Sequence, residues 1–128
     1  MDSEVLNILA VDDELSVAIS IRLALKAKGH SIDVTHSARD ALERIKLFPA
    51  HYQILITDHL MPEMTGLELV KQLKVTAFNG KIIILSAYLT IELENQYRAA
   101  GADRIMQKPF DLDDLKKAVK ELAPKPEP

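Results

Sequence analysis

Cysteine is absent from this chain of 128 residues, which excludes disulfide bonds, thiolate chemistry and metal sites with cysteine ligands. An excess of positive charge is also lacking: 16 Lys and Arg stand against 19 Asp and Glu, and no basic stretch is present. Direct binding to nucleic acid is therefore not expected. No apolar run approaches the ~20 residues that a membrane-spanning helix needs. Asp2 and Glu4 stand where a signal peptide carries positive charge, so we expect a cytoplasmic protein outside any membrane.

The composition is typical of one soluble globular domain, with 48% hydrophobic and 27% charged residues. The length suffices for a single domain with a full core. Residues 124–128 read Pro-Lys-Pro-Glu-Pro, which cannot continue a helix and is typical of a semi-rigid segment. We therefore predict a domain over residues 1–123 and a Pro-rich tail or linker over residues 124–128.

Short apolar runs alternate along the chain with amphipathic segments. The runs predict strands over residues 5–11, 31–36, 53–57, 82–85 and 104–107. The amphipathic segments predict helices over about residues 14–28, 37–48, 65–73, 90–100 and 111–122. Runs such as 54–56 and 82–85 lack in-out alternation, which indicates parallel strands covered on both faces. The alternation predicts an α/β fold: a flavodoxin-like three-layer sandwich with a five-stranded parallel sheet.

The expected strand order is 2-1-3-4-5, by analogy with known doubly wound sheets of this kind, since the residues themselves do not fix the order. Right-handed crossovers then place the first and fifth helices on one face and the other three on the opposite face. The first helix carries two apolar stripes. One is expected to pack on the sheet and contains Val17, Ile21, Ala24 and Leu25. The other contains Leu15, Ile19 and Leu23, and sheet packing does not explain it. The second helix is expected to hold the apolar residues Ala41, Leu42, Ile45 and Phe48 and to end at Pro49.

Polar side chains stand at the carboxyl ends of four predicted strands. Asp12 and Asp13 follow the first, Asp58 the third, Ser86 the fourth and Lys108 the fifth. Each alone has an ordinary explanation: a helix cap, a turn residue that bonds its own backbone, or a solvated lysine. Because the carboxyl ends of parallel strands share one edge of the sheet, these side chains are expected to converge on one crevice.

Carboxylates held close together repel one another unless a cation lies between them. A donor set of oxygens alone favours a hard ion, most simply Mg²⁺. Beside such an ion, Asp58 would act as a nucleophile toward phosphorus and form an acyl phosphate. The charge on the phosphoryl oxygens would be met by the Lys108 ammonium, the Ser86 hydroxyl and the backbone N–H groups of His59 and Ala87.

These motifs together resemble the receiver domain of two-component response regulators. The motifs, in order over about residues 6–122, are Val11-Asp12-Asp13-Glu14, Thr57-Asp58 with Met61-Pro62 and Gly66, Ser86-Ala87, and Lys108-Pro109-Phe110. The resemblance implies that Asp58 accepts a phosphoryl group from a histidine kinase or a histidine phosphotransfer protein. Such a domain is not an enzyme with a separate substrate; it catalyses its own phosphorylation and slow dephosphorylation.

The resemblance also implies a ligand set for Mg²⁺. Asp13, Asp58 and the backbone carbonyl of Leu60 would bind the ion directly, and Asp12 would act through water. Ser86 would swing toward the phosphoryl group, and Lys108 would pair with it, aimed inward by a cis peptide before Pro109.

Two departures from the family pattern concern switching and hydrolysis. Ile105 stands where many receivers carry Tyr or Phe, three residues before the lysine, so a side-chain hydroxyl cannot flip between solvent and interior. A homodimer or an attached effector domain is expected at the face of helix four, strand five and helix five. Output through this face would then depend on backbone and packing shifts, or be weak. Leu60 and Tyr88, at positions that tune hydrolysis, offer no carboxylate or amide to an attacking water. We expect self-dephosphorylation to take many minutes or longer.

The second stripe of the first helix, Leu15, Ile19 and Leu23, has a use in this family. Receivers dock their kinase or phosphotransfer helices against this helix and the loops above the site, and the stripe is expected to form that surface. The alternative is that these are exposed apolar residues without a role.

Other functions fit the residues less well. A haloacid-dehalogenase-type phosphatase needs a second aspartate two residues after the nucleophile, where this chain has Leu60. A flavodoxin-like electron carrier must cradle a phosphate in its first loop, which Asp12, Asp13 and Glu14 would repel. The remaining alternative is a phosphorylation-independent pseudo-receiver that acts as a protein–protein interaction module.

Overall fold

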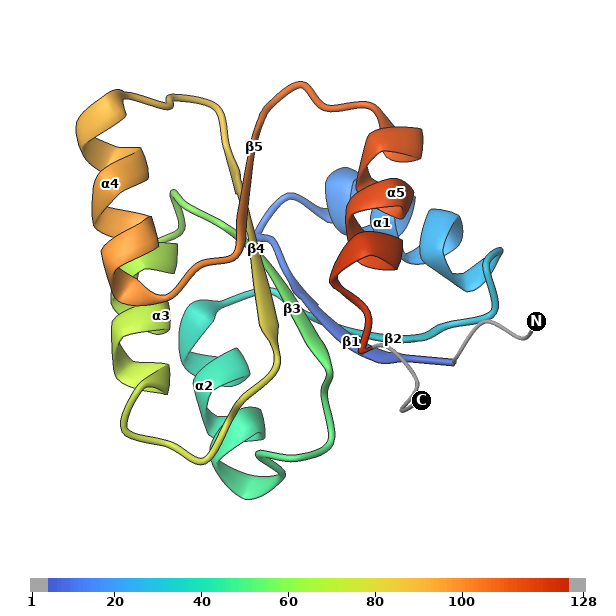
Figure 1. Ribbon diagram of the computed structural model, residues 1–128, viewed down its shortest axis with the longest axis horizontal. Coiled ribbons are helices and arrows are strands. Elements are labelled where there is room, and N and C mark those ends of the chain that lie inside the picture. The colour runs from blue at the N-terminus through green and yellow to red at the C-terminus, as the bar shows by residue number, and fades with distance from the viewer. Residues whose placement is uncertain (1–4, 125–128) are drawn as a thin grey trace.

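The computed structural model describes residues 5–124, so the predictions for Asp2, Glu4 and most of the Pro-rich tail lie outside the described residues. Within that range strands and helices alternate as predicted (Figure 1). The elements are β1 (Asn7–Val11), α1 (Leu15–Lys26), β2 (Ser31–Thr35), α2 (Ala38–Leu47), β3 (Ile54–Asp58), α3 (Gly66–Leu73), β4 (Lys81–Ser86), α4 (Ile91–Ala100), β5 (Arg104–Gln107) and α5 (Leu112–Leu122). No helix among residues 5–124 is long and apolar enough to cross a membrane.

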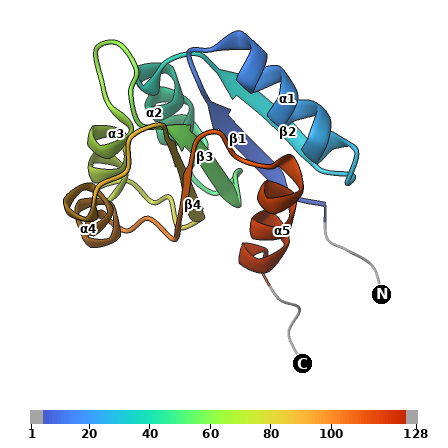
Figure 2. The ribbon, with the colours of Figure 1, turned by 90° about the horizontal axis from the view of Figure 1, so that it is seen from above.

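The strands form one parallel sheet of order β2-β1-β3-β4-β5, which confirms the predicted order. Helices α1 and α5 cover one face, and α2, α3 and α4 cover the other (Figures 1 and 2). The register aligns the carboxyl ends of the central strands, since Val11 pairs with Thr57 and Asp58 with Leu85. Residues that follow these strands therefore emerge at a single edge.

The central strands divide their side chains between two apolar cores. Ile8, Ile54 and Ile56 pack with residues of α1 and α5, whereas Leu9 and Leu55 pack with residues of α2, α3 and α4. Consecutive residues of a strand point to opposite faces, so both faces must be apolar when both are covered. Every residue of β3 is buried, as the missing in-out alternation predicted. Asp58 is thus the last residue of a strand without any solvent-facing side.

Side-chain and glycine caps define the ends of two helices near the site. The hydroxyl of Thr65 accepts a hydrogen bond from the Glu68 N–H, and the Glu68 carboxylate accepts from the Thr65 N–H, so α3 begins with a complete capping box. Gly101 ends α4 at φ +107°, in the left-handed region that glycine adopts without strain. These caps define the start of α3 and the end of α4, and both helices contact His59 in the β3–α3 loop, through Gly66 and Tyr97.

One expectation about helices was wrong, and the two ends of α1 differ from the prediction by one or two residues. Phe48 is 61% exposed: α2 ends at Leu47, and the backbone of Phe48 leaves the helical region, so its side chain is off the buried stripe. Helix α1 ends at Lys26, earlier than predicted, because the chain turns toward Gly29. Glu14 is the N-cap of α1, one position before the first helical residue.

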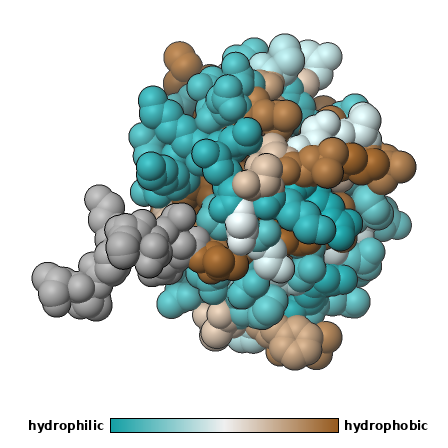
Figure 3. All heavy atoms as spheres, turned by 90° about the vertical axis from the view of Figure 1, so that its right-hand side faces the viewer, coloured by the Kyte–Doolittle hydropathy of each residue, from teal (hydrophilic) through white to brown (hydrophobic). Residues whose placement is uncertain are grey.

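The second stripe of α1 faces away from the sheet. Leu15, Ile19 and Leu23 are 61%, 47% and 64% exposed, whereas Ile21 and Leu25 of the first stripe are buried. On the side of the molecule that carries α1 and α5, apolar patches interrupt a largely hydrophilic surface (Figure 3). The sequence prediction of two separate apolar faces on α1 is confirmed.

Candidate functional site

Three carboxylates meet at the carboxyl edge of the sheet. Asp12 follows β1 and is 1% exposed, Asp58 ends β3 and is 5% exposed, and Glu14 lies at the exposed start of α1. One carboxylate oxygen from each lies within 4.8 Å of the others. The Asp12 carboxylate also accepts a hydrogen bond of 2.9 Å from the Glu14 N–H, which closes the turn between β1 and α1. We call these three residues the acid cluster.

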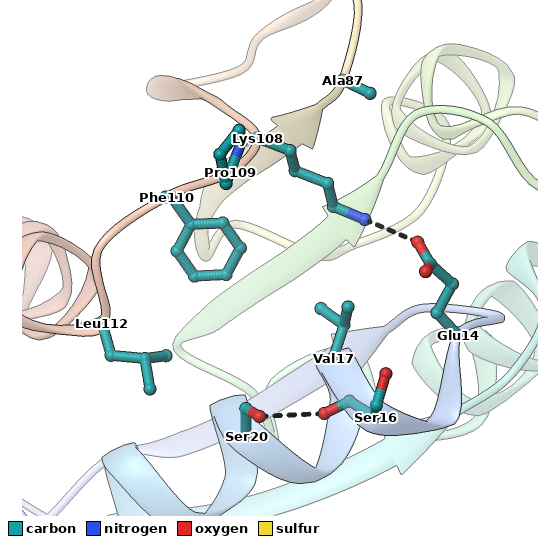
Figure 4. Close-up of a pocket in the computed structure, with 9 residues that line it drawn as sticks. All are labelled: Glu14, Ser16, Val17, Ser20, Ala87, Lys108, Pro109, Phe110 and Leu112. Atoms are coloured by element: carbon teal, nitrogen blue, oxygen red, sulfur yellow. Dashed lines mark hydrogen bonds and ion pairs between the residues drawn. The ribbon is translucent and has the colours of Figure 1, made fainter.

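Lys108 supplies the positive charge of the site. Its Nζ lies 3.2 Å from Asp12 Oδ2, 3.4 Å from Glu14 Oε1 and 3.4 Å from Asp58 Oδ2. Figure 4 shows the side chain reaching from the segment after β5 toward Glu14. The peptide bond between Lys108 and Pro109 is cis, as the resemblance implied. One ammonium against three carboxylates leaves the site with an excess of negative charge.

Burial is the main reason why the pKa of Asp58 is raised from 3.8 to about 6, and the charge of Asp12 adds to the effect. Lys108 and the N–H of His59, which donates to Asp58 Oδ1 at 2.8 Å, act in the opposite direction. For Lys108, burial alone would lower the pKa, but the charges of Asp12 and Asp58 outweigh it and raise the pKa. The lysine is therefore charged at neutral pH, and the buried pair of Asp12 and Asp58 is only partly compensated.

The other predicted phosphate-binding groups, Ser86, Ala87 and His59, lie at or just after the carboxyl ends of β3 and β4, at the same edge of the sheet. The Ser86 hydroxyl donates to the Tyr88 carbonyl at 2.8 Å and accepts from the Tyr88 N–H, so it is engaged in the β4–α4 loop. The N–H of His59 also lies 3.0 Å from the Leu85 carbonyl. Ala87 is exposed and, with Lys108, lines a groove that opens beside the acid cluster.

The predicted ligand Asp13 and the predicted tuning residues Leu60, Tyr88 and Ile105 lie outside the acid cluster. Asp13 is exposed, and its carboxylate is not one of the three that meet. The side chains of Leu60 and Tyr88 are 56% and 73% exposed. Ile105 is half-buried and packs against the core beneath α2, α3 and α4.

Glu14 is the site residue that the sequence interpretation missed, because an acid near a helix start has an ordinary role beside the macrodipole. Its position two residues after Asp12, in the loop at the same sheet edge, was the available indication.

Gly66 holds α3 against the backbone of Asp58. A Cβ at this position would collide with the Asp58 carbonyl oxygen and would lie 2.8 Å from the Tyr97 hydroxyl. The Gly66 N–H donates to the His59 carbonyl at 2.9 Å. Only a residue without a side chain permits this approach, so the glycine fixes the loop that follows the phosphoacceptor candidate.

A groove of about 500 Å³ runs from the acid cluster between the start of α1 and the segment that joins β5 to α5 (Figure 4). Its floor is apolar, from Val17, Phe110 and Leu112, and Glu14 and Lys108 lie among its polar lining residues. The groove therefore lies next to Lys108 and the acid cluster.

The chain belongs to the response regulator receiver domain family, whose model matches residues 8–120. Among curated proteins, the cell cycle transcriptional regulator CtrA of Caulobacter vibrioides is 29% identical over 110 residues, which cover 86% of this chain and 47% of that protein. The response regulator MprA of Mycobacterium leprae is 32% identical over 123 residues, which cover 96% and 53%. The chain thus spans about half the length of the curated relatives it matches.

Solved structures agree with the family. The receiver domain of the Francisella response regulator 1452 matches with a TM-score of 0.84 at 29% identity, covering 91% of this chain and 95% of that one. The chemotaxis protein CheY4 of Vibrio cholerae matches with a TM-score of 0.80 at 29% identity, covering 93% and 99%. The predicted family and fold are therefore confirmed.

Proposed function

We propose that Asp58 accepts a phosphoryl group from the phosphohistidine of a histidine kinase or phosphotransfer protein, and that the phosphorylated domain regulates a partner or an attached domain. The observation that carries the proposal is the placement of Asp58, buried at the end of β3 beside Asp12, with the Lys108 ammonium in contact with both carboxylates. With a pKa of about 6, Asp58 is mostly an ionised nucleophile at pH 7.5. A cytoplasmic location, expected from the sequence, is part of the same proposal.

The donor set fits a hard divalent cation. The acid cluster offers only carboxylate oxygens and holds them close together, which is the chemistry that Mg²⁺ accepts. By the family resemblance Asp13, Asp58 and the Leu60 carbonyl would hold the ion, with Asp12 acting through water. When bound, Mg²⁺ neutralises charge on the acids and on the phosphoryl oxygens.

The residues of the chain then have separate roles in the transfer. An oxygen of Asp58 forms the new bond to phosphorus as the bond between phosphorus and the donor imidazole nitrogen breaks, and the imidazole leaves with the electron pair. Lys108 pairs with the transferred group, and the backbone N–H groups of His59 and Ala87 donate to it. Ser86 exchanges its bond to the Tyr88 carbonyl for one to a phosphoryl oxygen, so phosphorylation reorganises the β4–α4 loop.

Incubation with acetyl phosphate and Mg²⁺, followed by intact mass measurement, tests the proposal. One phosphoryl group should be added to the wild type and none to Asp58→Asn. Asp113→Asn, the same change at an exposed acid of α5, should leave the adduct unchanged. No adduct on the wild type, either from acetyl phosphate or from a histidine kinase, would favour the phosphorylation-independent pseudo-receiver.

Slow loss of the phosphoryl group belongs to the same proposal. Leu60 and Tyr88 are exposed beside the site and carry no group that orients water toward phosphorus. The adduct should therefore persist for many minutes or longer in Mg²⁺ buffer. Complete decay within seconds contradicts this assignment of Leu60 and Tyr88.

Docking of the phosphoryl donor is proposed for the exposed stripe of α1, Leu15, Ile19 and Leu23, together with the adjoining groove. Ile19→Glu should slow phosphorylation by a histidine kinase or phosphotransfer protein and leave phosphorylation by acetyl phosphate unchanged. Equal effects on the two donors would remove the docking role. A homodimer or effector contact through α4, β5 and α5 remains a proposal from the family resemblance alone.

A further inference from the structure

Tyr97 is a buried polar residue that the proposed transfer does not use. It lies on α4, has no solvent exposure and is the largest fully buried side chain of the described residues. Its hydroxyl lies 2.6 Å from Nδ1 of His59, and the two rings meet edge to face with centroids 5.4 Å apart. A buried hydroxyl is costly without a partner, so this contact is required by the packing of α4.

The direction of the hydrogen bond follows from the surroundings. Burial, with a contribution from the charge of Asp58, raises the pKa of Tyr97, so the phenol keeps its proton. Burial lowers the pKa of His59, so the imidazole is neutral at physiological pH. Within residues 5–124 the Tyr97 hydroxyl has no hydrogen-bond partner other than His59. The phenol therefore donates to Nδ1, and the ring proton of His59 is on Nε2.

His59 is also tied to Asp58 through its backbone. Its N–H donates to Asp58 Oδ1 at 2.8 Å, and its carbonyl accepts from the Gly66 N–H at 2.9 Å. Two hydrogen bonds thus connect the carboxylate of Asp58 to Tyr97 on α4 through His59, one at its backbone N–H and one at its ring, and the covalent bonds of His59 join the two. Ile105, at the position of the expected aromatic switch, has no side-chain polar atom with which to make such a connection.

We propose that the hydrogen bond between His59 and Tyr97 couples the chemical state of Asp58 to α4. The inference rests on the proposed phosphorylation of Asp58 and adds a route for its effect. A phosphoryl group bonded to a carboxylate oxygen of Asp58 accepts the hydrogen bond that the His59 N–H now donates to Oδ1, so the peptide and ring of His59 shift. Gly66 packs against the Tyr97 hydroxyl, and the phenol has no second acceptor among the described residues, so Tyr97 follows the ring and α4 moves with it.

The test is amide NMR of the protein with and without Mg²⁺ and beryllofluoride. In the wild type, resonances next to Asp58 and those of α4 should both shift. In Tyr97→Phe, which removes only the hydroxyl, the resonances next to Asp58 should keep their response and those of α4 should lose most of theirs. Tyr52→Phe is the matched control, since it removes a hydroxyl bonded to Asp33, away from the site, and α4 should respond as in the wild type.

His59→Leu removes the acceptor of the same hydrogen bond, so the resonances of α4 should lose their response as they do in Tyr97→Phe. The double variant with both changes should lose no more of the α4 response than either single variant. A merely structural role for Tyr97 would lower the thermal stability of Tyr97→Phe and leave the α4 response intact, which would overturn the inference. So would an α4 response equal to the wild type in folded His59→Leu. A wild type that does not respond to beryllofluoride at all would instead overturn the proposed function.

Discussion

Replacing Asp58 by asparagine should stabilise the protein in the absence of metal, although it destroys the proposed phosphoacceptor. The ionised carboxylate is buried beside Asp12, and asparagine keeps an oxygen that can accept from the His59 N–H. A pKa raised from 3.8 to about 6 corresponds to ~3 kcal/mol that the charge costs the folded state. We therefore expect the free energy of unfolding at pH 8 to rise by at most ~3 kcal/mol.

The sign of the pH dependence follows from the same shift. Because the folded-state pKa of Asp58 is raised, the native protein takes up a proton more readily than the unfolded chain between pH 6 and 3.8. The wild type therefore regains, as the pH falls through this window, the stability that its ionised Asp58 costs above pH 6. The advantage of Asp58→Asn should be full at pH 8 and fade toward pH 4.

Urea unfolding in a chelating buffer, at pH values from 4 to 8, measures this difference, and thermal melts should show a rise on the order of 10 °C at pH 8. Asp13→Asn is the matched control: it removes an acid one residue from Asp12 that is exposed and outside the acid cluster, so its effect should be small. The charge argument fails if Asp58→Asn is no more stable than the wild type at pH 8, or if its advantage is equal at pH 4. Added Mg²⁺ should reduce the difference in the free energy of unfolding between Asp58→Asn and the wild type, because the ion stabilises the wild type.

Three further predictions concern stability. Gly66→Ala should cost ~1–3 kcal/mol in urea unfolding, because the new methyl group meets the Asp58 carbonyl; an unchanged midpoint would contradict this contact. Thr65→Ala should cost ~1 kcal/mol through the lost capping box, and Thr65→Ser should restore most of it. Burial lowers the pKa of His30, and its Nδ1 accepts a hydrogen bond from the Leu6 N–H. The wild type should therefore lose stability relative to His30→Gln as the pH falls through 6.5, because the unfolded chain takes up the proton more readily. Equal pH dependence of stability in the two proteins would contradict this role of His30.

The fold was predictable from the sequence because its main determinants are local. The apolar run 54–56 has no polar alternation, and a strand with that composition must be covered on both faces, as β3 is. The same patterns located the helices, whereas Phe48 was placed wrongly because apolar periodicity continues one residue past the end of α2. The positions of apolar residues do not specify the backbone torsion angles that decide where a helix ends.

The hydrogen bond between His59 and Tyr97 was not predictable in the same way. The two residues are 38 positions apart, and neither belongs to a motif that suggested a contact. Residues 91–100 carry a weak apolar stripe, so nothing in their spacing marks Tyr97 as the buried residue of α4. Side-chain contacts between separate elements depend on the packing of the whole domain, which sequence patterns do not specify.

The Mg²⁺ ligands implied by the family resemblance differ in one residue from the three carboxylates that meet in the structure. The family resemblance selects Asp13 as a direct Mg²⁺ ligand, whereas the acid that meets Asp12 and Asp58 is Glu14. Glu14 has a long, exposed side chain whose contact with Lys108 is 3.4 Å, and an exposed ion pair of this kind costs little to break. Its presence in the acid cluster therefore does not exclude Asp13.

Titration with Mg²⁺, followed by amide NMR, should distinguish the two acids. A carboxylate in direct contact with the ion contributes ~4 kcal/mol or more to the free energy of Mg²⁺ binding, at an effective dielectric constant near ~20. A carboxylate separated from the ion by solvent contributes ~1 kcal/mol. Asp13→Asn should therefore weaken Mg²⁺ binding by on the order of 100-fold or more, and Glu14→Gln by less than about tenfold. The reverse ranking would assign the ion to the acid cluster, with Glu14 as the ligand that the sequence motif did not reveal.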